Sequence, residues 1–298
     1  MKILSPAKLN LVLDILRKRK DGYHEVDFVM QELMLRDEVE IESVQDSSHI
    51  LISCTDPAVP IDEKNTCYRA VQLMQEECRK KGKTIQGARI HIEKRIPSAG
   101  GLGGGSSNAA SVLKGLNGLW KLDLSKNVLA DLAGKIGSDV PFFIYGKTCR
   151  AQGRGEIITS ISPCPVLHLA FIVPPVNVPP NKTQWIYSHF SVDKVMQHPS
   201  VENMMRCLSQ SNSSAETIAS HMGNAFEYLD IPQYDVVFSA IEQIKKLPGV
   251  FQCMLAGAGP TIVAVCDSEK TTSQLIQPFR MQGWVAFATQ TVKRATAD

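Results

Sequence analysis

The sequence predicts an α+β fold, because stretches with strand periodicity and stretches with helical periodicity are mixed without regular alternation. Apolar and polar side chains alternate over residues 8–15, 39–43 and 89–94, which is the pattern of strands. Between the last two stretches, Thr66–Lys80 carries apolar residues at helical spacing. A doubly wound sheet, which requires strict alternation of strand and helix, is disfavoured.

From residue 106 onward the predicted elements are separated by glycines and prolines. A helix is expected to begin near residues 106–108 and another over 126–136, with Ser125 as its N-cap and Gly137 at its end. The segment GSDVPFF, residues 137–143, resembles a turn. Residues 174–181, PPVNVPPN, form either a domain linker or a binding loop. A helix over 234–246, strands on both sides of the AGAG turn at 256–259, a helix near 272–281 and a strand over 284–291 complete the prediction.

Composition excludes several classes of protein. The 298 residues include 44% hydrophobic and 21% charged residues, which is typical of a globular protein in water. The net charge of +2 argues against nucleic acid or a membrane surface as a partner. The eight cysteines show no zinc-binding spacing and are expected to be reduced thiols. Polar residues interrupt the N-terminal apolar run, so no signal peptide is expected and the cytoplasm is the predicted location.

A glycine loop is the strongest chemical signal. Five glycines occur within residues 100–105, after a predicted strand and before a predicted helix. Such a backbone can approach a ligand closely, and the free N–H groups of the helix start attract phosphate. A flexible surface loop is the weaker alternative. The loop is neither a Walker motif nor a G-x-G-x-x-G fingerprint, which argues against a nicotinamide-dependent dehydrogenase.

The first predicted strand carries an unusual polar pair. Alternation is expected to place four apolar residues on one face: Leu9, Leu11, Leu13 and Ile15. Lys8 and Asn10 share the other face, and burying an unpaired ammonium is costly. The alternative is a lysine at a strand edge whose ammonium reaches water. Asp139 and His24 also have ordinary alternatives. Asp139 alone could be a solvated aspartate in a turn, and His24 alone could be a surface or core histidine.

Five motifs follow one another along the chain: SPAKLNL, DGYHE, PSAGGLGGGSSNAA, GSDVPFF and AGAGPT. In these motifs and their order the chain resembles the GHMP kinases, the superfamily of galactokinases, homoserine kinases, mevalonate kinases and phosphomevalonate kinases. SPAKLNL with DGYHE resembles the 4-diphosphocytidyl-2-C-methyl-D-erythritol kinases of the non-mevalonate isoprenoid pathway. The resemblance covers almost the whole chain. It implies an ATP-binding domain at 1–160, a second domain at 161–298, and ATP and substrate sites in the cleft between them. It also implies ATP-dependent phosphorylation of the 2-hydroxyl of a small substrate that carries cytidine diphosphate.

The resemblance also implies roles for individual residues. Lys8 and Asp139 would flank the reacting hydroxyl, with Asp139 as its base. The residues expected to bind the substrate are Asn10, Tyr23, His24, Thr183 and Tyr187. The residues expected to bind ATP are Asn65, Lys94, Pro97, Ser98, Ala99, Gly100, Gly101, Leu102, Gly103, Gly104, Gly105, Ser106, Ser107 and Asn108. Magnesium is expected to arrive with ATP, since the sequence contains no evident cage of acidic ligands.

Two departures from the family pattern stand out, and two alternatives remain. The stretch 178–181, which precedes Thr183 and Tyr187, looks longer than in the family. The family usually carries hydroxyl residues in its third glycine motif, where this chain has Ala256 and Ala258. A mevalonate- or homoserine-kinase-like enzyme is disfavoured by DGYHE and KTQWIY, because those substrates have no base to hold. A catalytically silent nucleotide-binding regulator is disfavoured by the presence of both Lys8 and Asp139. A monomer and a homodimer are equally compatible with the sequence.

Overall fold

The computed structural model describes residues 1–45, 47–98, 100–179 and 181–292, and within them the strands form two sheets. The larger sheet contains β1 (Lys2–Lys18), β2 (His24–Val44), β3 (Ile50–Cys54), β4 (Gly87–Glu93), β5 (Thr148–Gly153), β6 (Ile157–Ser160) and β8 (Gly223–Asn224). The smaller sheet contains β7 (His168–Val173), β9 (Val250–Leu255), β10 (Ile262–Cys266) and β11 (Val285–Gln290). The helices are α1 (Thr66–Lys80), α2 (Gly104–Leu119), α3 (Lys126–Gly134), α4 (Val140–Tyr145), α5 (Lys182–His189), α6 (Val201–Ser209), α7 (Ala215–Ser220), α8 (Asp235–Ile244) and α9 (Glu269–Met281). The prediction of an α+β fold is confirmed.

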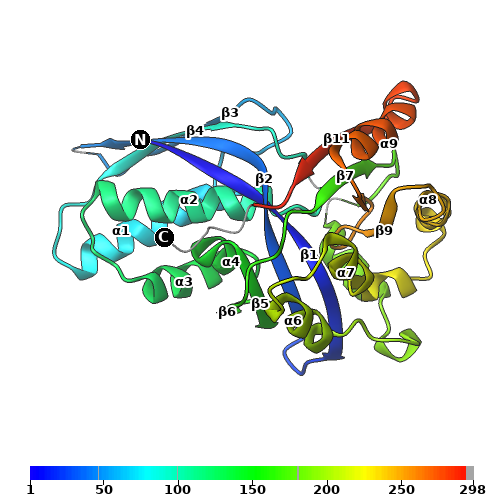
Figure 1. The fold of residues 1–298 in the computed structure, drawn as a ribbon. Coiled ribbons are helices and arrows are strands. Elements are labelled where there is room, and N and C mark those ends of the chain that lie inside the picture. Colours follow the sequence, from blue (N-terminus) through cyan, green and yellow to red (C-terminus); the bar gives the residue numbers. More distant parts are fainter. Residues whose placement is uncertain (46, 99, 180, 293–298) are drawn as a thin grey trace.

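The long antiparallel pair β1 and β2 runs across the molecule and connects its parts (Figure 1). The order of the larger sheet is β3-β4-β2-β1-β8, and β5 pairs with both β2 and β6. β3 and β4 are parallel neighbours, and α1 lies between them in the chain. The smaller sheet is antiparallel in the order β11-β7-β10-β9.

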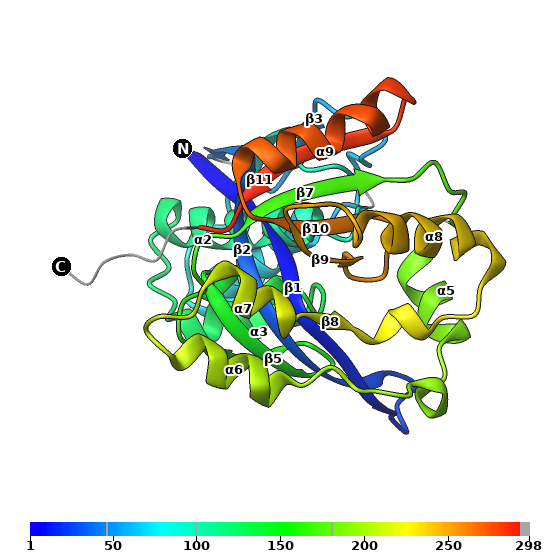
Figure 2. The ribbon, with the colours of Figure 1, turned by 45° about the vertical axis from the view of Figure 1, so that its right-hand side comes forward.

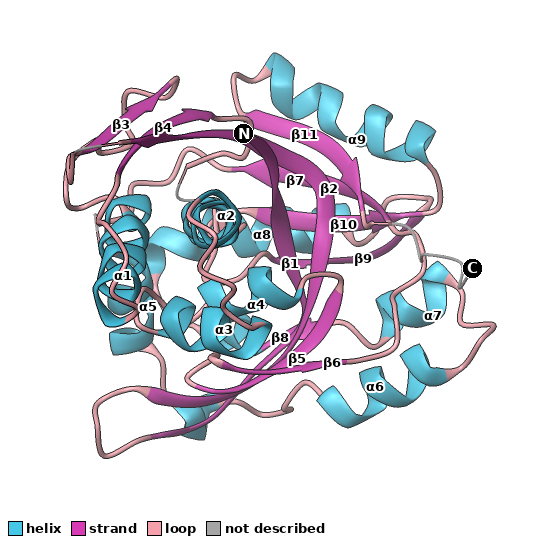
Figure 3. Ribbon diagram, turned by 90° about the vertical axis from the view of Figure 1, so that its left-hand side faces the viewer, coloured by secondary structure: helices cyan, strands magenta, loops and turns pink. Residues whose placement is uncertain are grey.

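Helices and the smaller sheet cover opposite faces of β1 and β2. α2 contacts both strands and α1 contacts α2, whereas α8 and α9 contact the smaller sheet (Figures 2 and 3). Leu9, Leu11 and Val29 of the long strands share an apolar cluster with Phe171 and Val263 of the smaller sheet. β1 is therefore buried on both faces over its central part, although its sequence alternates like a half-exposed strand.

The prediction that four apolar residues of the first strand share one face was wrong. Leu9 and Leu11 belong to the cluster that contacts the smaller sheet, whereas Leu13 and Ile15 belong to the other apolar cluster. The pairing of β1 with β2 shifts register between Asn10 and Val12. An irregularity of this kind inserts a residue into one strand and so interrupts its alternation.

Two further expectations were wrong. The helix expected from residues 106–108 begins earlier, so that α2 includes the last two glycines of the loop. GSDVPFF is not only a turn, since its second part forms the short helix α4, with Pro141 near its start. The predicted α1 bounds and the Ser125 cap of α3 are confirmed, although α3 ends at Gly134.

The structure also bears on the domain prediction and on the cysteines. The two sheets broadly follow the predicted division at residue 160, except that β8 pairs with β1, and the division stays a prediction. All eight cysteines are free thiols, as expected. No helix in the described part of the chain is long and apolar enough to cross a membrane.

Candidate active site

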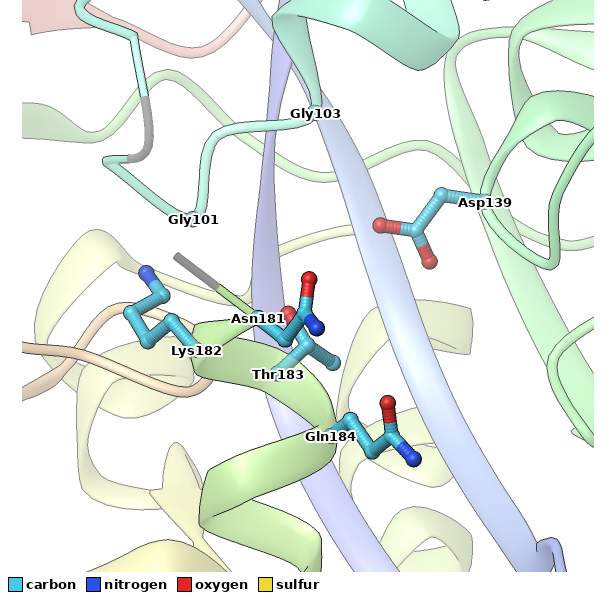
Figure 4. Close-up of a pocket in the computed structure, with 7 residues that line it drawn as sticks. All are labelled: Gly101, Gly103, Asp139, Asn181, Lys182, Thr183 and Gln184. Atoms are coloured by element: carbon cyan, nitrogen blue, oxygen red, sulfur yellow. The ribbon is translucent and has the colours of Figure 1, made fainter. Parts of the chain in front are cut away.

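Three adjoining cavities lie along the glycine loop. The first, here the glycine-loop cavity, has a volume of about 460 Å³ and is lined by residues between 58 and 108. The middle cavity, also about 460 Å³, lies between the loop, Asp139 and the start of α5 (Figure 4). The third, the aromatic cavity, has about 810 Å³ and is lined in part by Tyr23, His24 and Tyr187. Gly101 lines the first two cavities and Asp139 the last two, so the three cavities adjoin one another.

Close packing around the loop explains its glycines. Gly101 and Gly103 have φ angles of 76° and 73°, in the left-handed region that other residues rarely adopt. A Cβ atom on Gly101 would lie 2.7 Å from the carbonyl oxygen of Ala256. A Cβ atom on Gly103 would lie 3.0 Å from Cγ of Lys8. The loop is thus fitted between β1 and the third glycine motif, and it leads directly into the N-terminus of α2, where free N–H groups favour an anion.

A buried ion pair holds the two ends of the glycine loop in place. The Lys94 ammonium pairs with Asp37, whose side chain is fully buried. The same carboxylate accepts hydrogen bonds from the backbone N–H of Ile96 at 2.8 Å and from the amide of Asn108 at 3.0 Å. Asp37 was missed by the sequence analysis, because it stands between Arg36 and Glu38 and looks like one of several charged residues of this strand. Lys94 lines the glycine-loop cavity while bound to Asp37.

Most residues predicted to bind ATP gather at the glycine-loop cavity. Those that line it are Asn65, Lys94, Pro97, Ser98, Gly100, Gly101, Leu102, Gly103, Gly104, Gly105, Ser106 and Asn108. Asn65 is also the N-cap of α1, because its side-chain oxygen accepts from the N–H of Cys67 at 2.9 Å. Ser107 is different: it is fully buried, and its hydroxyl accepts a hydrogen bond from Ser5 at 2.8 Å. Ala99 lies outside the described residues.

Lys8 and Asp139 form the polar centre between the cavities. The Lys8 ammonium lies 3.4 Å from a carboxylate oxygen of Asp139 and donates to the side-chain oxygen of Asn10 at 3.2 Å. Lys8 is only 4% exposed, so the alternative of a lysine reaching water is wrong. Its backbone N–H also donates to the carbonyl of Leu102 at 2.9 Å, which ties β1 to the glycine loop. Asp139 precedes α4, and its partly exposed carboxylate faces the middle cavity.

The aromatic cavity unites the residues predicted to hold a base. Tyr23, His24, Thr183 and Tyr187 all line it, although they come from opposite halves of the sequence. The rings of His24 and Tyr187 stack on one another, with centroids 4.9 Å apart and an angle of 29°. Burial lowers the pKa of His24, and the charge of Lys18 lowers it further, so the imidazole is neutral at pH 7. Burial, with the Asp139 charge, raises the pKa of Tyr187.

Comparison with known proteins now identifies the family. Residues 65–147 match the family model described as the GHMP kinases N terminal domain. A 4-diphosphocytidyl-2-C-methyl-D-erythritol kinase of Geobacillus kaustophilus is 38% identical over 280 residues, which cover 94% of this chain and 93% of that protein. One of Bacillus subtilis is 36% identical over 282 residues, with 94% and 93% covered. The chain belongs to the 4-diphosphocytidyl-2-C-methyl-D-erythritol kinase family.

Solved structures agree with this membership. A crystal structure of a 4-(cytidine 5'-diphospho)-2C-methyl-D-erythritol kinase superposes with a TM-score of 0.79 at 27% identity, covering 99% of this chain and 100% of that one. A homoserine kinase from Cytophaga hutchinsonii superposes with a TM-score of 0.69 at 17% identity, covering 98% and 94%, and shows the fold alone. The family resemblance inferred from the sequence motifs is confirmed.

Two cationic side chains of this family member were missed by the sequence analysis. Arg154 lines the aromatic cavity, with its guanidinium 4.8 Å from the ring centroid of Tyr23. Lys182 lines the middle cavity and donates a hydrogen bond to the carbonyl of Gly259. Arg154 had no usable signal in the sequence, whereas Lys182 directly precedes Thr183, which was predicted to bind substrate. Within the described residues, no group of three or more His, Cys, Asp or Glu side chains is arranged to hold a metal ion.

Proposed function

We propose that this kinase transfers the terminal phosphoryl group of ATP to the 2-hydroxyl of 4-diphosphocytidyl-2-C-methyl-D-erythritol. The observation that carries the proposal is the position of Asp139. Its carboxylate, beside the Lys8 ammonium, stands where a glycine-rich phosphate cavity meets an aromatic cavity. In the cell we place this step in the cytoplasm, on the non-mevalonate route to isoprenoid precursors.

ATP would occupy the glycine-loop cavity. Its phosphates would lie against the backbone N–H groups of the loop and the N-terminus of α2, where a negative charge is stabilised. The adenosine would lie toward Asn65, Pro97 and Ser98, which line the same cavity. Lys94 is held by Asp37 and would act mainly through the loop that this pair supports.

Transfer would take place in the middle cavity. Asp139 would accept the proton of the 2-hydroxyl while the hydroxyl oxygen forms a bond to the terminal phosphorus, and the bond from that phosphorus to the leaving oxygen of ADP breaks. The Lys8 ammonium, which lies 3.4 Å from the Asp139 carboxylate, would stabilise negative charge on the transferring group. A positioned base typically contributes ~10²–10⁴-fold in rate.

Magnesium fits this site as an ion that arrives with the nucleotide. Mg²⁺ prefers oxygen ligands and commonly takes several from substrate phosphates. The Ser106 hydroxyl, which lines both outer cavities, is the side chain best placed to join them. When bound, the ion would neutralise part of the phosphate charge.

The cytidine would occupy the aromatic cavity. Tyr23 and Tyr187 offer flat partners for the base, and the neutral His24 can both donate and accept a hydrogen bond. His24 and Tyr187 stack on each other in the described structure, so a base that enters between them would have to separate the rings. Thr183 would lie closer to the transfer site, because it also lines the middle cavity.

A coupled assay of ADP release tests the proposal. The purified chain is supplied with Mg–ATP and with the cytidine conjugate, mevalonate or homoserine in parallel. Turnover with the cytidine conjugate alone is expected, with NMR of the product placing the new phosphate on the 2-hydroxyl. Turnover with mevalonate or homoserine instead would overturn the substrate assignment, and ATP binding without any turnover would favour a silent regulator.

A further inference from the structure

Lys182 is a buried lysine at the start of α5, between the proline-rich segment and Thr183. It is 8% exposed, and its ammonium donates a hydrogen bond to the carbonyl of Gly259 in the third glycine motif. Burying an ammonium is unfavourable, and burial together with the nearby Lys8 charge lowers the pKa of Lys182 to about 8. An anion close to the ammonium would offset this cost.

The middle cavity supplies the place for that anion. Lys182 lines it together with Gly101, Gly103 and Asp139. In Figure 4 the Lys182 side chain reaches from the start of α5 toward the glycine loop near Gly101, while Asp139 faces the cavity from the other side. An anion held by the loop in this cavity would therefore have the Lys182 ammonium on one side and the Asp139 carboxylate on the other.

The neighbouring turn strengthens this reading. The third glycine motif packs against the loop at Gly101, but Ala256 and Ala258 offer no polar side-chain atom to a phosphate. Lys182 is attached to the same turn through Gly259. Asn224 also fixes this turn, because its amide donates to the carbonyl of Gly257 at 2.8 Å. The Lys182 ammonium is thus held by a hydrogen-bonded turn. On this side of the cavity, Ala256 and Ala258 supply no polar or charged side chain.

We propose that Lys182 is a second phosphate-binding cation of the site, which contacts the terminal phosphate of ATP from the side opposite Asp139. The inference rests on the proposed function, since it assumes that ATP occupies the glycine-loop cavity. It makes Lys182 selective for nucleoside triphosphates, because a diphosphate does not extend into the middle cavity.

Calorimetric titration with Mg–AMPPNP and Mg–ADP tests this selectivity in the full chain and in Lys182→Met. Lys182→Met removes a hydrogen-bonded charge pair with the terminal phosphate, which only the triphosphate analogue carries. AMPPNP is therefore expected to bind about 10-fold more weakly, while the affinity for ADP changes less than about 3-fold. Lys182→Gln separates charge from anchoring, because an amide can still donate to Gly259 but carries no charge. The affinity of Lys182→Gln for AMPPNP is expected to fall as much as that of Lys182→Met.

Lys114 provides the matched control. Its ammonium donates to the carbonyl of Phe143 at 3.1 Å, but it lines none of the three cavities. Lys114→Met is expected to leave both affinities unchanged, and a thermal melt checks that every variant is folded. Equal weakening of AMPPNP and ADP in Lys182→Met, normal AMPPNP binding in Lys182→Gln, or no change in either variant would overturn the role of Lys182. Failure of the unaltered chain to bind AMPPNP would instead overturn the proposed function.

Discussion

The cavities on the two sides of Asp139 are built in different ways. The glycine-loop cavity is lined by residues between 58 and 108, and five of its eighteen lining residues are glycines, which present only backbone. The aromatic cavity is lined by side chains from residues 18–28, 106, 138–139, 154 and 183–188, which only the folded chain brings together. A backbone lining suits phosphate, which is common to many substrates, whereas a side-chain lining suits one particular base.

The two constructions also respond differently to change. The loop is fixed by positive φ angles at Gly101 and Gly103 and by the buried Asp37–Lys94 pair, so an added side chain collides with backbone or core. The aromatic cavity relies on rings such as Tyr187 that can be replaced without disturbing the loop. A substitution in either cavity is therefore expected to weaken binding of the one ligand that occupies it. A substitution of Asp139, between the cavities, is expected to slow turnover although both ligands still bind.

The largest effect is expected at the centre. Asp139→Asn removes the base but keeps the size of the side chain, so kcat should fall by ~10²–10⁴-fold while the affinity for Mg–AMPPNP stays within about 3-fold. Steady-state kinetics beside calorimetry measures both quantities. A kcat within a few-fold of the unaltered enzyme would remove Asp139 from the role of base.

The glycine loop should give the next largest effect. Gly101→Ala forces a Cβ into a left-handed backbone and against the carbonyl of Ala256, and the backbone strain alone is worth ~1–2 kcal/mol. We expect AMPPNP to bind ~10–100-fold more weakly, with little change in KM for the cytidine substrate. Gly118→Ala is the control, because a Cβ there meets nothing within 4 Å. Equal losses for both ligands would show that the two cavities are not independent.

Removal of a ring from the aromatic cavity should act on the other ligand. Tyr187→Ala is expected to raise KM for the cytidine substrate by ~10-fold and to leave KM for ATP unchanged, since stacking on a ring is worth ~1–3 kcal/mol per base. Phe190→Ala is the matched control: Phe190 packs on Phe226 as Tyr187 does, but it does not line the cavity. A lower melting temperature without a selective change in KM would make Tyr187 a core residue.

Selectivity among bases should depend on His24 more than on the rings. Stacking tolerates any base, whereas a hydrogen bond to the Watson–Crick edge discriminates between them. His24→Ala is therefore expected to narrow the preference for cytidine over uridine conjugates. Steady-state kinetics on both conjugates measures the ratio of kcat/KM, and an unaltered preference would contradict the assignment of His24.

The smallest effect is a pH dependence that comes from Lys182. Its pKa of about 8 lies below the usual value for lysine because of burial and the charge of Lys8, while Asp139 faces it across the middle cavity. AMPPNP affinity should therefore fall a few-fold as pH rises through about 8. The free energy of unfolding should rise over the same pH range, because the unfolded chain keeps a proton on Lys182 that the folded chain has lost. Both trends should be absent from Lys182→Met, and titrations and melts at pH 7 and 9 compare them.

The difference between the cavities also explains what the sequence could predict. The glycine loop and the helix after it are contiguous, so local chemistry alone indicated a phosphate site. Lys8 looked ambiguous because its partner Asp139 is distant in the sequence, and their 3.4 Å contact depends on the fold. Tyr187 and His24 were grouped only by family resemblance. Arg154 gave no signal in its local sequence, whereas Lys182 was overlooked although it directly precedes Thr183 in the KTQWIY segment.

Errors in the predicted fold have similar causes. The alternation of the first strand was read without the register shift beside Asn10, which depends on pairing with β2. GSDVPFF was read as a turn because only its last four residues, 140–143, belong to α4, and four residues are too few for a helical period to be visible. The length of α1 was predicted correctly because its periodicity and its Asn65 cap are both local.

A structure of the ternary complex with Mg–AMPPNP and the cytidine substrate tests the central claim most directly. We predict the triphosphate on the glycine loop, the cytosine in the aromatic cavity, and the 2-hydroxyl in the middle cavity, within hydrogen-bond distance of Asp139 and roughly 3–3.5 Å from the terminal phosphorus. The nucleotide base of AMPPNP in the aromatic cavity, or a 2-hydroxyl that lies away from Asp139, would contradict the account.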